Sequence, residues 1–119
     1  MRIKERIVFL DRAALGGDEL PIPSFDHNWS EYPATEAADL VPRLFWATTA
    51  ITHACPLDAN SLGQLHKLVR IIVTDPAVVD VDACSTRGIA VRNLPASDTP
   101  GQALIRLLET LVDEASPDT

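Results

Sequence analysis

Seven polar side chains follow short apolar runs of the sequence or lie close to their ends: Asp11, Arg12, His27, His53, Thr74, Asp75 and Asn93. The carboxyl ends of parallel strands meet at one edge of a sheet, and α/β proteins usually bind ligands at that edge. Carboxylate, imidazole, hydroxyl and amide groups gathered there can bind a small molecule. We therefore predict a candidate ligand rim made of Asp11, Arg12, His53, Thr74, Asp75 and Asn93.

Other chemistry at this rim fits the residue pattern less well. Histidines and aspartates can ligate a metal, but here they come singly from different segments without a ligand motif, so we expect no metal site. A thiolate at Cys55 would need a neighbouring base, and His53 would point the same way from a strand. Nothing else marks an oxyanion site, so we interpret Cys55 as a buried structural residue. Cys55 and Cys84 lack CxxC spacing and are expected to be reduced.

Charge and hydropathy restrict the kinds of partner. The 119 residues include 10 basic and 17 acidic side chains, which gives a formal charge of −7. This charge repels phosphate backbones, so nucleic acid is not an expected partner. No apolar run approaches the roughly 20 residues of a membrane span. We therefore expect a cytoplasmic protein with no membrane partner.

Alternating apolar runs and helix signals predict the elements that must position the rim. Strands are expected at residues 6–11, 48–54, 69–73 and 89–92, with a weaker edge strand near 24–29. Helices are expected at 36–44, 58–65, 81–87 and 99–115. Their predicted start and stop residues are the N-caps Thr35, Asp58, Asp80 and Thr99, and Gly88 at the end of the third helix.

This alternation implies right-handed crossovers and a parallel sheet covered on both faces. We predict a single α/β domain over residues 1–119, with a three-layer, flavodoxin-like arrangement. Its five parallel strands are expected in the order 2-1-3-4-5, followed by a long C-terminal helix.

Three segments carry a resemblance to a known family. Residues 7–11 read IVFLD, residues 55–62 read CPLDANSL, and residues 80–95 read DVDACSTRGIAVRNLP. Together they resemble the substrate-binding domain of the D-isomer-specific 2-hydroxyacid dehydrogenases, which are NAD-dependent oxidoreductases acting on CH–OH groups. In that family the helix matching residues 99–115 leads to the NAD domain.

The resemblance covers only the part of these enzymes outside the NAD domain. The family's pyrophosphate-binding GxGxxG turn has no counterpart among the glycines present: Gly16, Gly17, Gly63, Gly88 and Gly101. The family's catalytic arginine, glutamate and histidine also belong to the absent portion, so we assign no catalytic or cofactor-binding residue here. We expect this chain to bind no cofactor, with NAD(P) present only if a partner chain supplies a Rossmann domain.

The turn after the fourth strand departs from the family pattern. Family members place a glycine-containing turn there, and its backbone N–H groups hold the substrate carboxylate. This chain has Asp75 and Pro76 instead, which add a negative charge and remove an N–H donor. Carboxylate binding of the family type is therefore not expected.

Three functions from different classes follow. The first, which we favour, is a stand-alone relative of the substrate-binding domain that acts as a small-ligand or protein-interaction module without catalysis. The second is one half of a split NAD-dependent enzyme completed by a separate NAD-binding chain, and the third is a ligand-free structural remnant. The apolar positions of the last helix cover more than one stripe, which predicts a homodimer. The expected interface residues are Leu104, Leu107, Leu108 and Leu111.

Overall fold

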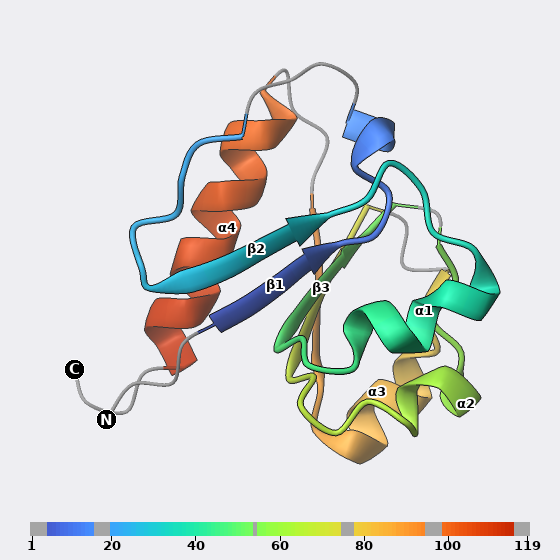
Figure 1. Ribbon diagram of the computed structural model, residues 1–119. Helices are drawn as coiled ribbons and strands as arrows, with labels where there is room; N and C mark the ends of the chain where they lie inside the picture. Colours follow the sequence, from blue (N-terminus) through green and yellow to red (C-terminus); the bar gives the residue numbers. More distant parts are fainter. Residues whose placement is uncertain (1–4, 16–19, 54, 75–77, 95–98, 116–119) are drawn as a thin grey trace.

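The protein folds around one parallel β-sheet (Figure 1). Its structure is a computed structural model that describes residues 5–15, 20–53, 55–74, 78–94 and 99–115. The strands lie in the order β2-β1-β3-β4-β5 and all pair in parallel, which confirms the predicted sheet order and α/β class. Their bounds are β1 Glu5–Phe9, β2 His27–Glu31, β3 Thr49–Thr52, β4 Arg70–Val73 and β5 Ala90–Asn93.

The edge strand β2 begins three residues later than predicted. In the described residues it pairs with β1 from Glu5 opposite His27 to Phe9 opposite Glu31. The preceding segment crosses one face of the sheet, where Phe25 packs against the core. His27 consequently stands at the amino end of its strand, and its predicted place near the ligand rim is wrong.

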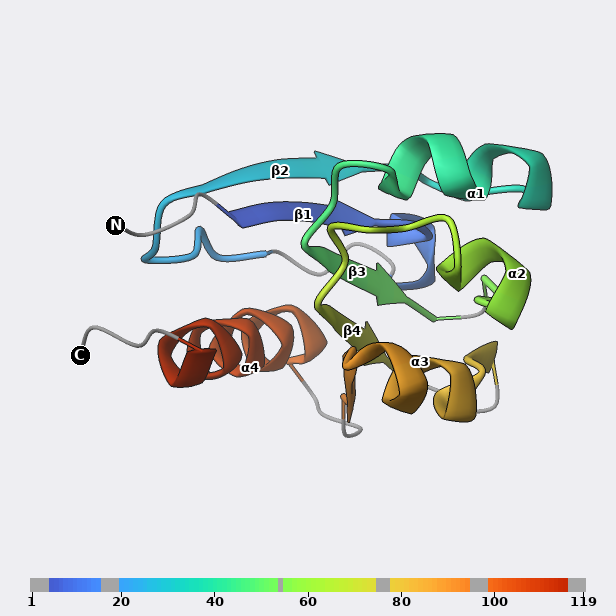
Figure 2. The same ribbon diagram turned by 90° about the horizontal axis from the view of Figure 1, so that it is seen from below.

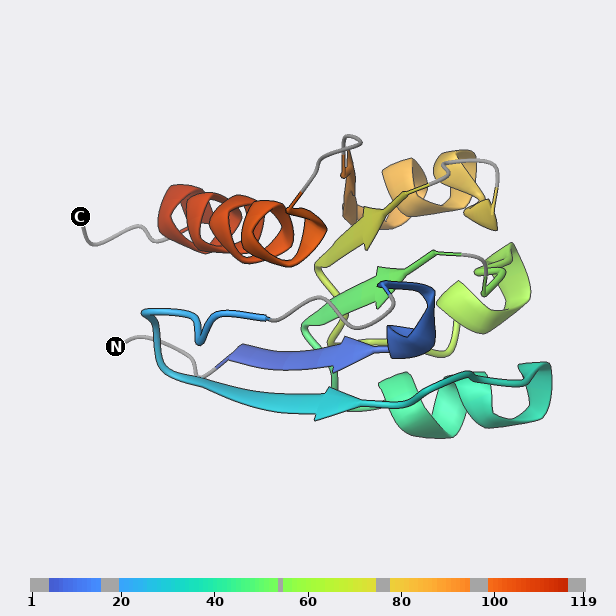
Figure 3. The ribbon, with the colours of Figure 1, turned by 90° about the horizontal axis from the view of Figure 1, so that it is seen from above.

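Helices cover both faces of the sheet, as Figures 2 and 3 show from opposite sides. α1 (Ala37–Leu44), α2 (Ala59–Leu62) and α3 (Val81–Arg87) lie on one face, and α4 (Pro100–Ala115) lies on the other. A short 3-10 helix, η1 (Arg12–Leu15), follows β1. No helix in the described ranges is long and apolar enough to span a bilayer.

Side-chain alternation along the strands produces two cores. Val8 and Leu10 point to the face covered by α1, α2 and α3, whereas Ile7 and Phe9 point to the face covered by α4. All four are buried. Because both faces of the central strands are covered, these strands read as continuous apolar runs rather than alternating ones.

The leucines predicted as a dimer interface lie in the second of these cores. Leu104 and Leu108 have no exposed area, Leu111 is 7% exposed, and Leu107 packs partly buried against the same cluster. In the described part of the chain, α4 and residues 20–25 together cover this face of the sheet. The wide apolar surface of α4 is therefore buried within the chain. These leucines thus pack within the chain, and the homodimer itself stays a prediction.

Capping side chains and a glycine set several of the helix starts and ends. The Asp58 carboxylate accepts the N–H of Ser61, which holds the pKa of this carboxyl below its ordinary value, and Asp80 accepts the N–H of Ala83. Gly88 ends α3 with a φ of 74°, a left-handed conformation that favours glycine. α2 ends at Leu62, earlier than predicted, because the N–H groups of Gln64 and Leu65 donate to carbonyls three residues back instead of four.

Thr35 does not cap α1, contrary to the prediction. The N-cap position is Glu36, whose side chain makes no capping hydrogen bond. The Thr35 hydroxyl instead donates to the carbonyl of Leu10 at 2.7 Å and accepts from Arg43 at 2.8 Å. Thr35 therefore ties α1 to the end of β1, a tertiary contact that no local pattern encodes.

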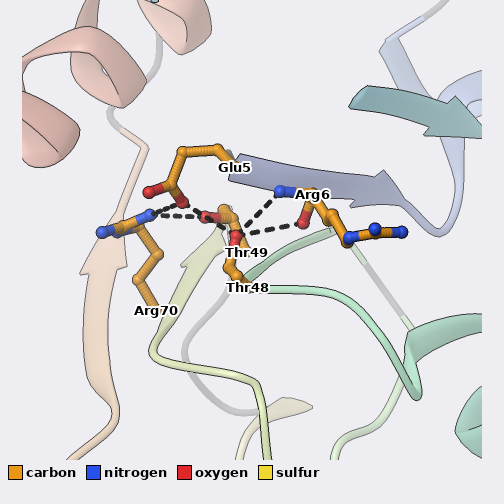
Figure 4. A network of polar contacts seen from close by, with 5 residues as sticks. All are labelled: Glu5, Arg6, Thr48, Thr49 and Arg70. Atoms are coloured by element: carbon orange, nitrogen blue, oxygen red, sulfur yellow. Dashed lines mark hydrogen bonds and ion pairs between the residues drawn. The ribbon is translucent and has the colours of Figure 1, made fainter. Parts of the chain in front are cut away.

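A polar network closes the amino-terminal edge of the sheet (Figure 4). Arg70 Nη1 donates to Glu5 Oε1 at 2.6 Å and to Thr49 Oγ1 at 2.9 Å. Thr48 Oγ1 donates to the same Glu5 oxygen at 2.8 Å and accepts the N–H of Arg6 at 3.0 Å. The network joins β1, β3 and β4 at the end opposite to the candidate rim.

Candidate functional site

Four of the predicted rim residues form a row along the carboxyl edge of the sheet. Asp11 follows β1, His53 follows β3, Thr74 follows β4, and Asn93 ends β5. The order of these strands in the sheet is the order of the residues in the row. We call this set, Asp11, His53, Thr74 and Asn93, the rim row.

Hydrogen bonds connect neighbouring members of the rim row. Both carboxylate oxygens of Asp11 accept the backbone N–H of His53 at 2.9 Å. His53 Nδ1 is hydrogen-bonded to the Thr74 hydroxyl. With its amide nitrogen turned toward β4, Asn93 donates to the carbonyls of Thr74 and Val73 at 3.1 Å each. The row is therefore one connected polar arrangement.

The rim row is open to solvent. His53, Thr74 and Asn93 are exposed and Asp11 is half-buried. The bond to Thr74 uses Nδ1 of His53, and within the described residues Nε2 has no hydrogen-bond partner. The imidazole can therefore donate to or accept from a ligand without losing its place in the row.

Of the two remaining predicted rim residues, the structure describes Arg12. Arg12 directs its side chain toward β2, where its Nε lies 3.6 Å from Glu31 Oε2, and its N–H donates to Tyr32 O. Asp75 lies outside the described residues.

Cys55 is buried behind the row as a structural thiol. Its N–H donates to Thr52 Oγ1 and its carbonyl accepts from the same hydroxyl, each at 3.0 Å. Burial, and then the nearby charge of Asp11, raises the pKa of this thiol. The structure shows no hydrogen bond between Cys55 and His53, so the pair does not form an activated nucleophile. In the structure Cys55 and Cys84 are both free and buried.

The described residues do not fit a dinucleotide. A phosphate-binding turn would open at the carboxyl end of β1, but β1 ends at Phe9, and the carboxylate of Asp11, two residues beyond, would repel a pyrophosphate. The chain then enters η1, where the N–H of Arg12 is already bonded to Tyr32 O and that of Ala13 to Pro33 O. Within the same residues, no three His, Cys, Asp or Glu side chains gather as metal ligands do.

Fold and rim together define a parallel α/β domain with a row of polar residues along one edge of its sheet. In sequence, the chain is 38% identical over 111 residues to a Haemophilus influenzae protein assigned as a 2-hydroxyacid dehydrogenase, covering 89% of this chain and 35% of that protein. It is 34% identical over 93 residues to the glycerate dehydrogenase of Methylorubrum extorquens, covering 76% of this chain and 29% of that enzyme. The chain thus spans about a third of the length of these curated relatives.

Solved structures show the same fold. The NAD⁺-bound 3-phosphoglycerate dehydrogenase of Entamoeba histolytica superposes with a TM-score of 0.61 over 78% of this chain and 33% of that one, at 17% identity. A Ralstonia solanacearum protein assigned as a D-3-phosphoglycerate dehydrogenase gives 0.62 over 77% of this chain and 30% of that one, at 21% identity. No protein-family profile matches the sequence. The resemblance to 2-hydroxyacid dehydrogenases, predicted from three short segments, is confirmed over most of the chain.

Proposed function

We propose that this chain is a ligand-binding domain of the 2-hydroxyacid dehydrogenase type, which binds a small hydroxylated molecule at the rim row and transfers no hydride by itself. The observation that carries the proposal is the connected set of hydrogen bonds from Asp11 through His53 and Thr74 to Asn93. Such a row holds its exposed donors and acceptors in fixed positions before a ligand arrives, which lowers the cost of ordering them on binding.

The charges of the row select the ligand group that can face it. The Asp11 carboxylate would repel a ligand carboxylate placed beside it, whereas a hydroxyl can donate to Asp11 or to the His53 imidazole. A short 2-hydroxy acid suits this arrangement if its hydroxyl end faces the row and its carboxylate faces solvent. The similarity to a glycerate dehydrogenase makes D-glycerate the first probe.

We propose that these residues alone do not transfer a hydride, because a dinucleotide does not fit at the end of β1. Without a bound nicotinamide, a 2-hydroxy acid has no hydride acceptor. The proposal also places the protein in the cytoplasm, where the buried Cys55 and Cys84 would stay reduced.

A titration of ¹⁵N-labelled protein with D-glycerate tests the proposal. Backbone amide signals of His53 and Thr74 should shift in a saturable way, and His53→Ala should weaken binding about tenfold or more, since a good hydrogen bond is worth about 1.4 kcal/mol. His66→Ala is the matched control, because His66 is exposed but lies far from the row, in the segment that leads into β4. Equal binding by His53→Ala, or shifts confined to other regions, would contradict the proposal.

A second function is favoured by the length of the relatives, which are about three times as long as this chain. In it, these residues are one part of an NAD-dependent 2-hydroxyacid oxidoreductase, and the Rossmann domain is supplied by other residues or by a separate chain. Mixing the protein with a dinucleotide-binding polypeptide and measuring D-glycerate oxidation tests this function. Turnover that appears only in the mixture supports the second function, and binding without turnover supports the first. If the protein shows neither binding of D-glycerate nor turnover in the mixture, the remaining function is a structural domain without ligand.

A further inference from the structure

The outer side of β2 presents backbone groups that pair with none of the described residues. Tyr32 N–H donates to Phe9 O at 3.0 Å, and Glu5 N–H donates to Asp26 O at 3.3 Å, so the even-numbered residues of this segment face β1. Backbone direction alternates along a strand in a parallel pair, and the odd-numbered residues of β2 therefore point their N–H and C=O groups outward. β2 is the first strand of the sheet order, and Figure 2 shows it at the border, with none of the described helices or strands beyond it.

Both faces of β2 are flanked by hollows. The odd-numbered side chains line a hollow of about 260 Å³ on the α4 face, whose wall includes Ile22, 85% exposed. The even-numbered side chains line one of about 420 Å³ on the opposite face, next to Trp46, 60% exposed. A strand placed beside β2 would thus find room for its side chains on either face. Proteins normally protect a sheet edge with lysine, proline or a bulge, and β2 carries none of these.

The sequence of β2 is complementary to itself when reversed. It reads His27, Asn28, Trp29, Ser30, Glu31. Antiparallel pairing centred on Trp29 places His27 opposite Glu31 of a second copy, and Glu31 opposite its His27. In this register the residues whose backbone N–H and C=O groups point outward lie opposite one another. They can therefore form the hydrogen-bonded pairs of an antiparallel ladder. A histidine directly opposite a carboxylate can donate a ring N–H to it, and favourable cross-strand pairs of this kind stabilise a sheet.

We propose that two copies of this chain pair antiparallel through β2, in the register centred on Trp29, and join their sheets into one. The two hollows on the α4 face would then lie side by side across the two-fold axis, and the exposed Ile22 side chains would border the new contact. The rim row lies along the carboxyl edge of the sheet, so ligand binding and dimer formation can fail independently.

Engineered disulfides test the register. In this pairing Asn28 faces Ser30 of the second copy in a non-hydrogen-bonded pair, where Cα atoms lie about 4.5 Å apart, within the range that a disulfide spans. Both side chains are exposed, so cysteines there should not disturb the core. The double variant Asn28→Cys/Ser30→Cys should form a covalent dimer on mild oxidation. The single variants are the matched controls and should stay largely uncrosslinked, because each cysteine then faces a non-cysteine residue.

Sedimentation of the unmodified protein supplies the second measurement. It should show a concentration-dependent dimer, and His27→Glu should weaken the dimer about tenfold, because a carboxylate then faces Glu31 in both symmetry-related pairs. Crosslinking of either single variant at the rate of the double variant would overturn the register. The interface would be overturned if the wild type stayed monomeric at all concentrations up to about 1 mM and the double variant did not crosslink. A dimer with a Kd of about 1 mM has a binding free energy of about −4 kcal/mol.

Discussion

Arg70 Nη1 lies 2.6 Å from Glu5 Oε1, with side chains only 7% and 15% exposed, so an ion pair joins the first and fourth strands inside the amino-terminal edge of the sheet (Figure 4). A buried charge that loses its partner keeps its desolvation cost without compensation. We expect Glu5→Gln to lower the free energy of unfolding by about 3 kcal/mol, as measured by urea denaturation.

An ion pair with a more exposed carboxylate supplies the control for that experiment. Glu31 lies 3.6 Å from Arg12 and is 45% exposed, so Glu31→Gln should cost no more than about 1 kcal/mol. Replacing both buried partners by apolar residues, as in Glu5→Leu/Arg70→Met, should recover most of the loss because no unpaired charge remains. Equal losses at positions 5 and 31 would show that burial of the Arg70 pair does not matter.

Asp11 is expected to position His53 through its backbone. Asp11→Ala removes the acceptor of the His53 N–H and should destabilise the protein by about 1 kcal/mol. Asp11→Asn keeps an acceptor oxygen and should lose less. Thermal unfolding should give the highest unfolding temperature for the wild type, a lower one for Asp11→Asn and the lowest for Asp11→Ala. If Asn and Ala variants unfold alike, the negative charge of Asp11 rather than its acceptor role supports the row.

The two buried thiols predict a loss of stability in alkali. Burial first, and a nearby aspartate second, raises the pKa of Cys55 and of Cys84 above the ordinary value of 9.0. The unfolded chain therefore releases these protons at lower pH than the folded chain, so their contribution is complete below about pH 9 and disappears as pH rises through the folded-state pKa values. Urea unfolding of the wild type between pH 7 and 10 should show this decline, and Cys55→Ala/Cys84→Ala should show a smaller one.

Thiol alkylation gives an independent view of the same effect. Because Asp11 contributes to the raised pKa of Cys55, Asp11→Asn should lower that pKa and speed alkylation of Cys55 by iodoacetamide at neutral pH. Alkylation of Cys84 should not change, because the nearby charge that acts on it is Asp80. Mass spectrometry of the two cysteine peptides measures both rates.

Gly88 is expected to be sensitive to substitution through its backbone alone. Its φ is 74°, and a Cβ added there would meet no atom within 4 Å, so only the left-handed conformation opposes a side chain. Gly88→Ala should cost about 1 kcal/mol, and Gly88→Asn should cost less because asparagine tolerates this region. Denaturant titration of both variants checks the order, and equal losses would point to a cause other than φ.

Local chemistry in the sequence determined much of the fold. The apolar runs that became β1, β3 and β4 are buried on both faces, so their composition reported the burial directly. Asp58, Asp80 and Gly88 act on backbone groups within four residues of themselves, and these caps were predicted correctly. The alternation of strands and helices then restricted the sheet to a parallel one, since right-handed crossovers leave few other arrangements.

Only the tertiary structure decided what depends on neighbours distant in the sequence. Thr35 looked like a helix cap, but its hydroxyl donates to the carbonyl of Leu10 and accepts from Arg43, and the N-cap position is Glu36. The apolar stripes of α4 suggested a partner, but a helix that covers a sheet face almost alone needs a wide apolar surface, and periodicity cannot tell which surface buries it. The linkage of Asp11, His53, Thr74 and Asn93 likewise depends on strand order and register, because residues 42 and 21 positions apart become neighbours only when the sheet has formed.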